Sequence, residues 1–180
     1  MGQYFVAVLS RGVSKSEFVD GIEGRVRAWD FDNGAKLMEH AYIGNPVPGT
    51  VVSLIAADPA RVVWAGDYAD EEVGGSTLYR IVDGARSLTA EPEDGSRYIL
   101  DLDRLEYVDL HCVEPFDADG DWRVHPLPLL TCEGNGRGGG DFRGSDPYLG
   151  LWARDLVTAA ADGWEPSAGW EQIFPEFQES

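Results

Sequence analysis

The chain has 180 residues, 43% of them hydrophobic and six of them Trp, and it carries a formal net charge of −18. This composition excludes a disordered chain, because it supplies enough apolar surface for a core. The charge argues against nucleic acid and anionic membranes as partners, since both attract cationic proteins. It favours basic partners or divalent cations, and a solvated acidic surface is the alternative interpretation.

The negative charge is concentrated in the middle of the sequence. Between Gly66 and Asp121 there are 16 acidic residues and four basic ones, whereas Thr131 to Asp155 contains four acidic residues and three arginines. The first segment is therefore a candidate surface for a cationic partner. The second is nearly balanced and has arginines available for an anion.

The first residues do not form a secretory signal, because no basic segment precedes the short apolar run Tyr4–Leu9. No stretch is long and apolar enough to predict a membrane span. We therefore expect a cytoplasmic protein in which Cys112 and Cys132 are free thiols.

Strands and short helices alternate in the first half of the predicted structure. The pattern predicts strands over Gln3–Ser10, Arg25–Phe31 and Arg61–Ala65. Short helices are expected over Ala35–Tyr42 and over Val51–Ala57, the second capped by Thr50. Thr77–Val82 fits either a short strand or a short helix.

A β-hairpin is the clearest element of the second half. Its arms are Arg97–Leu102 and Leu105–Leu110, and apolar residues alternate with polar ones in both. Two prolines predict that Val124–Leu130 is extended, at a sheet edge or outside a sheet. Pro147–Ala161 is ambiguous, and we favour a strand that changes to a turn or helix near Ala159.

These elements predict an α+β fold, mainly an antiparallel sheet with two or three short helices and long loops. We expect one domain over residues 1–162. The tail, residues 163–180, is acidic and holds four large aromatic side chains, which we expect to pack on the domain because such groups are rarely left in water.

A glycine-rich segment from Glu133 to Arg143 is the strongest candidate for a binding loop. It combines five glycines with charged and amide side chains. It matches neither a P-loop nor a dinucleotide fingerprint. Consecutive glycine amides can nevertheless surround an anion, and Arg137 and Arg143 can add bidentate contacts. A surface loop with self-paired Arg and Asp is an equally good interpretation.

A second candidate segment is Trp64–Asp70, at the predicted end of a strand. Asp67 and Asp70 are acid/base or metal-ligand candidates there, with Tyr68 between them. An acidic turn that caps the next element is the alternative. Arg154 and Asp155, farther along, are candidates either to complete the site or to make structural ion pairs.

Histidine and cysteine supply the remaining chemical candidates. His125 is the best candidate for a general acid or base, because its unperturbed pKa lies near neutrality and two prolines fix its surroundings. A histidine that only binds a backbone carbonyl is the more common alternative. Cys132 is a candidate nucleophile, although a free Cys is more often a buried structural residue. The spacing of the His and Cys residues does not match a zinc site. Asp117, Asp119 and Asp121 resemble the start of a calcium loop without its later ligands, which leaves a weak divalent-cation site open.

Several long motifs resemble an uncharacterised family of small bacterial and phage proteins. The similar segments are Met1–Tyr4, Lys36–His40, Trp64–Asp70, Glu106–Asp109, His125–Thr131, Glu133–Gly144 and Trp152–Asp155. The family has Tyr where this chain has Phe142 and Ala where it has Cys132, which weakens the case for a catalytic Cys. The resemblance implies a shared polar site and names no activity.

The sequence thus predicts a pocket for a small anionic ligand, a nucleotide or a sugar phosphate. His125, Asp67 or Asp141 would transfer protons, and hydrolysis or group transfer is the reaction class that such residues suit. The other expected ligand-binding residues are Tyr68, Asp70, Glu133, Asn135, Gly136, Arg137, Gly138, Gly139 and Arg143.

An acidic interaction module is the second hypothesis. It would be an inhibitor or immunity protein that docks a basic partner through Gly66–Asp121. An acidic scaffold with a flexible loop is the third.

Overall fold

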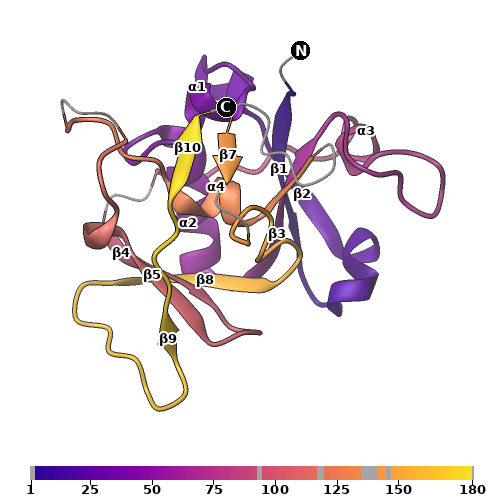
Figure 1. Ribbon diagram of the computed structural model, residues 1–180. Helices are drawn as coiled ribbons and strands as arrows, with labels where there is room; N and C mark the ends of the chain where they lie inside the picture. The colour runs from indigo at the N-terminus through magenta and orange to yellow at the C-terminus, as the bar shows by residue number, and fades with distance from the viewer. Residues whose placement is uncertain (1–2, 93–94, 117–119, 135–141, 145–146, 180) are drawn as a thin grey trace.

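The computed structural model describes residues 3–92, 95–116, 120–134, 142–144 and 147–179 (Figure 1). Its main sheet has the strand order β2-β1-β3-β8-β4-β5-β9, with β6 paired to β3 beside this path. These strands are β1 (Phe5–Ser10), β2 (Ile22–Val26), β3 (Ala60–Gly66), β4 (Ser96–Asp101), β5 (Glu106–Asp109), β6 (Cys132–Glu133), β8 (Leu156–Ala161) and β9 (Glu171–Gln172). A separate pair joins β7 (Phe142–Gly144) to β10 (Phe177–Glu179).

Short helices surround the sheet. The α-helices are α1 (Leu37–His40), α2 (Pro46–Ala57), α3 (Leu78–Ile81) and α4 (Pro126–Leu130). The 3₁₀ helices are η1 (Lys15–Gly21), η2 (Ala28–Phe31) and η3 (Leu110–Cys112). In the described residues the strand pairs are antiparallel except β3–β6 and β5–β9, so the predicted α+β fold is confirmed.

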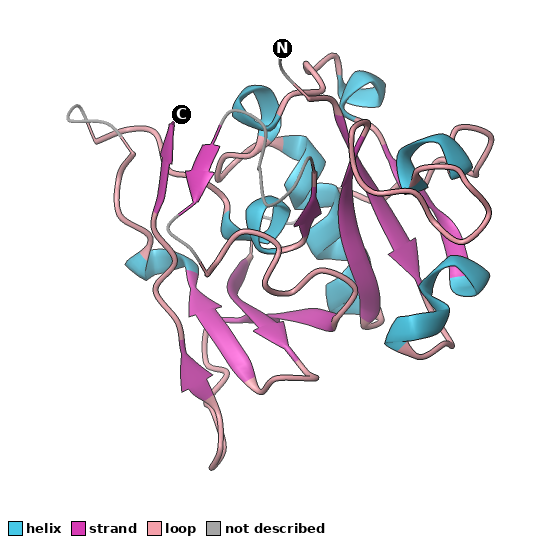
Figure 2. Ribbon diagram, turned by 45° about the vertical axis from the view of Figure 1, so that its right-hand side comes forward, coloured by secondary structure: helices cyan, strands magenta, loops and turns pink. Residues whose placement is uncertain are grey.

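The two central strands β1 and β3 are buried on both faces. Ala7 and Leu9 belong to a core shared with α2 and α4, while Val6 and Val8 face a smaller core made with η1 and α3. Alternate side chains of a strand point to opposite faces, so two apolar layers bury every residue of β1. Figure 2 shows these strands running between helices.

The sheet has a narrow join in its middle. β3 and β8 share only two register pairs, Ala60 with Val157 and Arg61 with Leu156. By contrast, β1 pairs with β3 along its full length, and β4 pairs with β8 over most of theirs. We call this join the seam. It connects a β2-β1-β3 half to a β8-β4-β5-β9 half.

Most predicted strands are confirmed, with shifted ends. β1, β3 and the β4–β5 hairpin lie where the sequence pattern placed them, and Leu100 pairs with Tyr107 as an antiparallel hairpin requires. The strand predicted over Arg25–Phe31 is wrong beyond Val26, because the chain turns there into η2. Thr77 caps α3, which settles that segment as a helix.

Proline misled two predictions. Val124–Leu130 is not extended: it contains α4, whose prolines occupy the first turn, where a missing N–H costs no helical hydrogen bond. Helix α2 begins at Pro46 rather than after Thr50. Its N-cap is Asn45, whose Oδ1 accepts a hydrogen bond from the Val47 N–H at 2.8 Å.

The order favoured for Pro147–Ala161 is also wrong. Turns occupy its first part, and the strand β8 comes last. The tail lies along the body: β9 pairs with β5, and Trp164 lies 5.2 Å from the ring centres of both Tyr98 and Tyr107. Among the described residues, none of the helices has the length and apolar character to cross a bilayer.

Candidate functional site

A polar cleft lies where β3 and β6 end. These two strands are parallel, with Trp64 beside Cys132 and Ala65 beside Glu133. The loops that follow them therefore leave the sheet at the same edge, which is where sheet proteins commonly bind ligands. The cleft has a volume of about 640 Å³, and its lining residues are Asp70, Glu71, Glu72, Cys132, Glu133, Gly134, Pro147, Leu149, Gly150, Leu151, Ala153 and Arg154.

The wall opposite these loops is the turn segment up to Arg154. The N–H of Gly150 donates to Leu129 O at 2.9 Å, the N–H of Trp152 to Leu130 O at 2.7 Å, and the N–H of Arg154 to Val62 O at 3.0 Å. These bonds fix the wall against α4 and β3. Gly150 has φ +70°, and a Cβ there would lie 2.6 Å from the carbonyl oxygen of Cys132, so the close approach requires glycine.

Arg154 is the central charged group of the cleft. Its guanidinium donates to both carboxylate oxygens of Glu133, at 2.6 and 2.9 Å, and also binds Glu72. Hydrogen bonding to Glu133 raises the pKa of Arg154 further above its ordinary value, so the positive charge is permanent. The residue has φ +67°, a left-handed conformation that is unfavourable for a side chain with a Cβ.

Asp155, the next residue, belongs to a separate buried network. Its carboxylate forms ion pairs with Lys15 and Arg104 and a hydrogen bond with Asp101. Burial raises the pKa of Asp101 to about 8, and the neighbouring Asp155 adds to the effect. Burial alone would also raise the pKa of Asp155, but the hydrogen bonds from Lys15, Asp101 and Arg104 lower it.

The surroundings of Oδ2 of Asp101 explain why the pKa of Asp101 is raised while that of Asp155 is lowered. That oxygen is buried and accepts no hydrogen bond, since the Nε of Arg104 stays 3.9 Å away from it. A proton on Asp101 turns this acceptor into a donor to Asp155, which satisfies both groups. Arg154 and Asp155 therefore make ion pairs with different segments, the structural alternative that the sequence left open.

Only some of the predicted site residues meet. Asp70 and Glu133 line the same cleft, as the sequence predicted. Asp67 instead binds the chain just before β1: its Oδ1 accepts a hydrogen bond from the N–H of Tyr4 at 3.1 Å. Tyr68 is half exposed and does not line the cleft.

The glycine-rich part of the predicted pocket stays a prediction. Asn135, Gly136, Arg137, Gly138, Gly139 and Asp141 lie outside the described residues. Arg143 is described only through its backbone, which pairs with Gln178 in the β7–β10 ladder.

The surroundings of His125 do not support its expected role in proton transfer near neutral pH. The residue is buried, and burial lowers its pKa to about 3, so the ring is neutral at physiological pH. Its Nδ1 accepts from the N–H of Leu127 at 3.2 Å and caps α4. Cys132 is also buried, and burial raises its pKa to about 12, so it is not the activated thiolate that a nucleophile requires.

The part of the chain that the structure describes holds no group of three or more His, Cys, Asp or Glu residues arranged for a metal ion. His111 and Cys112 are exposed while His125 and Cys132 are buried, so these residues do not form one site. Asp117 and Asp119 of the calcium-like segment lie outside the described residues.

Glu71 and Glu72 were not predicted as site residues, whereas Arg154 was named as a candidate to complete the site or to make an ion pair. The sequence held part of the signal, because Glu71 and Glu72 directly follow Asp70, which had been named as a candidate.

Comparison with known proteins does not indicate a function for the cleft. No family model matches this chain, and the curated proteins and the solved structures yield no significant match.

Proposed function

We propose that this chain is a binding module whose acidic cleft receives a cationic group of a basic protein partner. The charge balance of the cleft carries the proposal. Among the described residues, its lining has four carboxylates, on Asp70, Glu71, Glu72 and Glu133, and one arginine, Arg154. An excess of fixed negative charge attracts guanidinium and ammonium groups and repels anions.

The arginine of the cleft is already occupied. The guanidinium of Arg154 already binds Glu133 and Glu72, so an anionic ligand would have to displace one of these glutamates to reach it. Asp70 and Glu71 are exposed, and within the described residues neither forms an ion pair. They are the carboxylates that a basic side chain would meet first.

The whole molecule supports this assignment through long-range attraction. A net charge of −18 on 180 residues steers a basic protein toward the surface and raises its association rate. The anionic-ligand hypothesis depends instead on glycines and arginines outside the described residues. Since His125 has lost its support as a proton-transfer group, we propose binding rather than catalysis.

The test compares two doubly neutralised variants. Hexa-arginine with blocked ends is titrated by calorimetry into the wild type, Asp70→Asn/Glu71→Gln, and the control Glu91→Gln/Glu165→Gln. Both variants lose the same net charge, and Glu91 and Glu165 are exposed residues that do not line the cleft. We expect the cleft variant to bind about fivefold more weakly than the control, the worth of two exposed ion pairs.

Equal weakening of both variants would mean that the peptide responds only to the overall charge, which overturns the proposal. A nucleotide that raises the melting temperature, with the increase lost in Arg137→Ala, would instead support the anionic-ligand hypothesis.

A further inference from the structure

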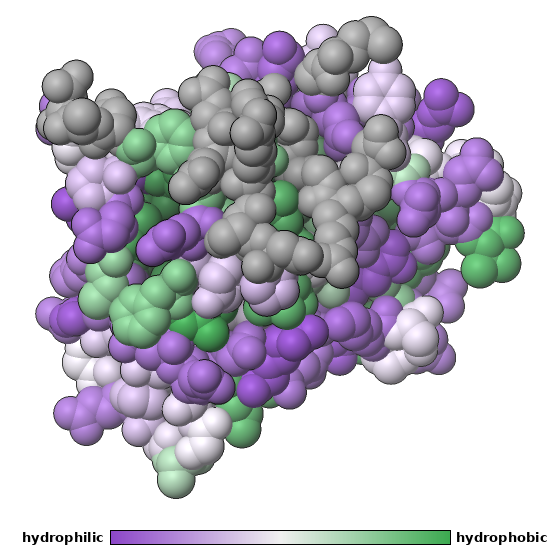
Figure 3. Space-filling view, in the orientation of Figure 1, coloured by the Kyte–Doolittle hydropathy of each residue, from purple (hydrophilic) through white to green (hydrophobic). Residues whose placement is uncertain are grey.

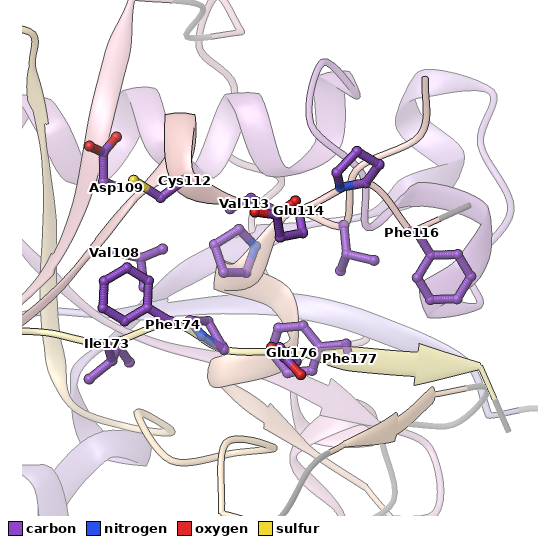
Figure 4. Close-up of a pocket in the computed structure, with 14 residues that line it drawn as sticks. Val108, Asp109, Cys112, Val113, Glu114, Phe116, Ile173, Phe174, Glu176 and Phe177 are labelled. Atoms are coloured by element: carbon purple, nitrogen blue, oxygen red, sulfur yellow. The ribbon is translucent and has the colours of Figure 1, made fainter. Parts of the chain in front are cut away.

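A second cavity, the tail groove, lies on the other half of the sheet. Its walls are residues 112–116, which follow from the end of η3, and residues 173–177, which lead from β9 into β10 (Figure 4). Val108, Val124 and Pro126 also line it, and its volume is about 390 Å³. In Figure 3 a hydrophobic patch bordered by hydrophilic residues marks the surface over the chain between β9 and β10.

Both walls of the tail groove are held by hydrogen bonds to the rest of the protein. The N–H of Ile173 donates to Tyr107 O at 2.9 Å, and the N–H of Phe116 donates to Trp122 O at 2.7 Å. The ring of Phe116 packs edge-on against Trp122, with ring centres 4.5 Å apart. The groove is therefore formed before a ligand arrives, which reduces the entropy cost of binding.

Rings make up most of the apolar lining. The phenyl rings belong to Phe116, Phe174 and Phe177, and the pyrrolidine rings belong to Pro115, Pro126 and Pro175. In Figure 4 Phe174 and Phe116 lie at opposite ends of the lining side chains. Phe174 is 59% exposed, so a ligand between the two ends would cover a phenyl ring that faces water. Such a lining suits a flat ring system, because phenyl rings that pair edge to face gain more than their contact area alone provides.

The carboxylates of the lining leave little charge for a ligand to neutralise. Asp109 accepts hydrogen bonds from Arg97, at 2.8 and 3.0 Å, and from the thiol of Cys112, and the bonds from Arg97 above all lower its pKa. Glu176 has an interaction of its own within the protein. Glu114 is exposed and has no partner among the described residues. One exposed carboxylate attracts a cation only weakly, but it opposes an anion that enters the same groove.

We propose that the tail groove binds an uncharged aromatic compound of about two or three rings, which packs between Phe116 and Phe174. The size of the cavity, the rings of its lining, and carboxylates that are already partnered or exposed to water together select this ligand class. The tail groove shares no lining residue with the acidic cleft, so this site does not depend on the function proposed for the cleft.

The first experiment tests the charge of the ligand with three probes that share a naphthalene body. They are 2-naphthol, 2-naphthoate and 2-naphthylmethylammonium, each titrated by calorimetry into the full chain near neutral pH. We expect 2-naphthol to bind about tenfold more tightly than 2-naphthoate, because the carboxylate loses hydration and meets Glu114. The ammonium probe should bind within about fivefold of 2-naphthol, which is the worth of one exposed ion pair.

The second experiment tests the rings. Decahydro-2-naphthol carries the same hydroxyl on a saturated body and should bind about threefold more weakly than 2-naphthol. Phe174→Ala should weaken 2-naphthol about tenfold, and Phe174→Leu, which keeps an apolar contact, about threefold. Trp29→Ala is the matched control and should leave binding unchanged, because Trp29 on η2 is 60% exposed and does not line the groove.

The third experiment locates the ligand. Cys112 is exposed in the groove wall whereas Cys132 is buried, so iodoacetamide labels Cys112 selectively, and mass spectrometry follows the rate. At about ten times its dissociation constant, 2-naphthol should slow this labelling about tenfold, because it leaves few grooves empty.

Any one of four results would overturn the proposal. They are no binding of 2-naphthol at up to about 1 mM, a charged probe that binds more than about tenfold more tightly than 2-naphthol, equal binding of the saturated and aromatic alcohols, and a labelling rate of Cys112 that 2-naphthol leaves unchanged.

Discussion

Asp101 couples the stability of the fold to pH. Its carboxyl is fully buried at the end of β4, where Oδ1 accepts the N–H groups of Asp103 and Arg104, each at 2.9 Å. Its charged neighbours are the ion-paired Asp155 with Lys15 and Arg104, and Glu106, which lies within electrostatic range of Arg104. The folded protein therefore holds a proton that the unfolded chain releases at much lower pH.

The sign of the pH dependence follows from the raised pKa. The pKa of Asp101 is about 8 in the folded protein and 3.8 as its ordinary value. The stability from the shared proton is complete below about pH 4 and is lost as the pH rises toward 8. Asp101→Asn keeps both accepted hydrogen bonds and stays neutral. Its stability relative to the wild type should therefore rise by at least about 1 kcal/mol between pH 5 and pH 8.

Urea unfolding at several pH values measures this difference. Asp20→Asn, at an exposed position, is the control for the loss of one carboxylate. A parallel result for both variants would show that Asp101 is ionised in the folded protein.

The sequence predicted the roles of some site residues better than those of others, because it does not show which side chains are buried. The chemistry of imidazole in water made His125 the acid/base candidate, whereas a buried structural role was the more common expectation for Cys132. Reactivity depends on burial, and both side chains are at most 5% exposed. Asp70 was named because it follows a predicted strand end, and Glu133 because it opens the glycine-rich segment; both line the cleft.

At the scale of elements, the apolar pattern predicted strands better than proline predicted the absence of a helix. The β4–β5 hairpin follows from the period of two in its side chains, whereas β1 and β3 are short apolar runs of the kind that forms strands buried on both faces. β6 has only two residues, too few for any period, and its parallel pairing with β3 is what brings Glu133 to the cleft. The sequence therefore could not predict that this strand pairing places Glu133 in the same cleft as Asp70.

Gly150, in the turn segment that forms the cleft wall, can be compared with Gly12, which lies just after β1. The two glycines have φ of +70° and +74°, but of the two only Gly150 faces an atom that a Cβ would strike. Gly12→Ala should cost about 1 kcal/mol of unfolding free energy from the backbone alone. Gly150→Ala should cost at least about 2 kcal/mol more, because the wall must move away from Cys132.

Urea unfolding monitored by circular dichroism gives both values. Equal losses in the two variants would mean that the wall relaxes freely, and the hydrogen bonds from Gly150, Trp152 and Arg154 would then have to be weak.

At the scale of the whole molecule, charge repulsion opposes folding. Acidic residues outnumber basic ones 32 to 14, so screening should remove more repulsion than attraction. Raising NaCl from about 10 mM to about 300 mM should therefore raise the melting temperature. Scanning calorimetry measures the shift, and a fall would show that the ion pairs around Arg154 and Asp155 outweigh the surface repulsion.

The seam between β3 and β8 is the part of the main sheet where the backbone ladder is shortest. Only two register pairs cross it, whereas one apolar core, with Leu9 and Val62 on one side and Ile99 and Val157 on the other, joins the two halves through side chains. Salt bridges such as Lys15–Asp155 and Arg61–Asp103 add to these contacts. Amide exchange should therefore start by local opening at the β3–β8 join, while the shared interior keeps the amides of both halves protected until the whole domain unfolds.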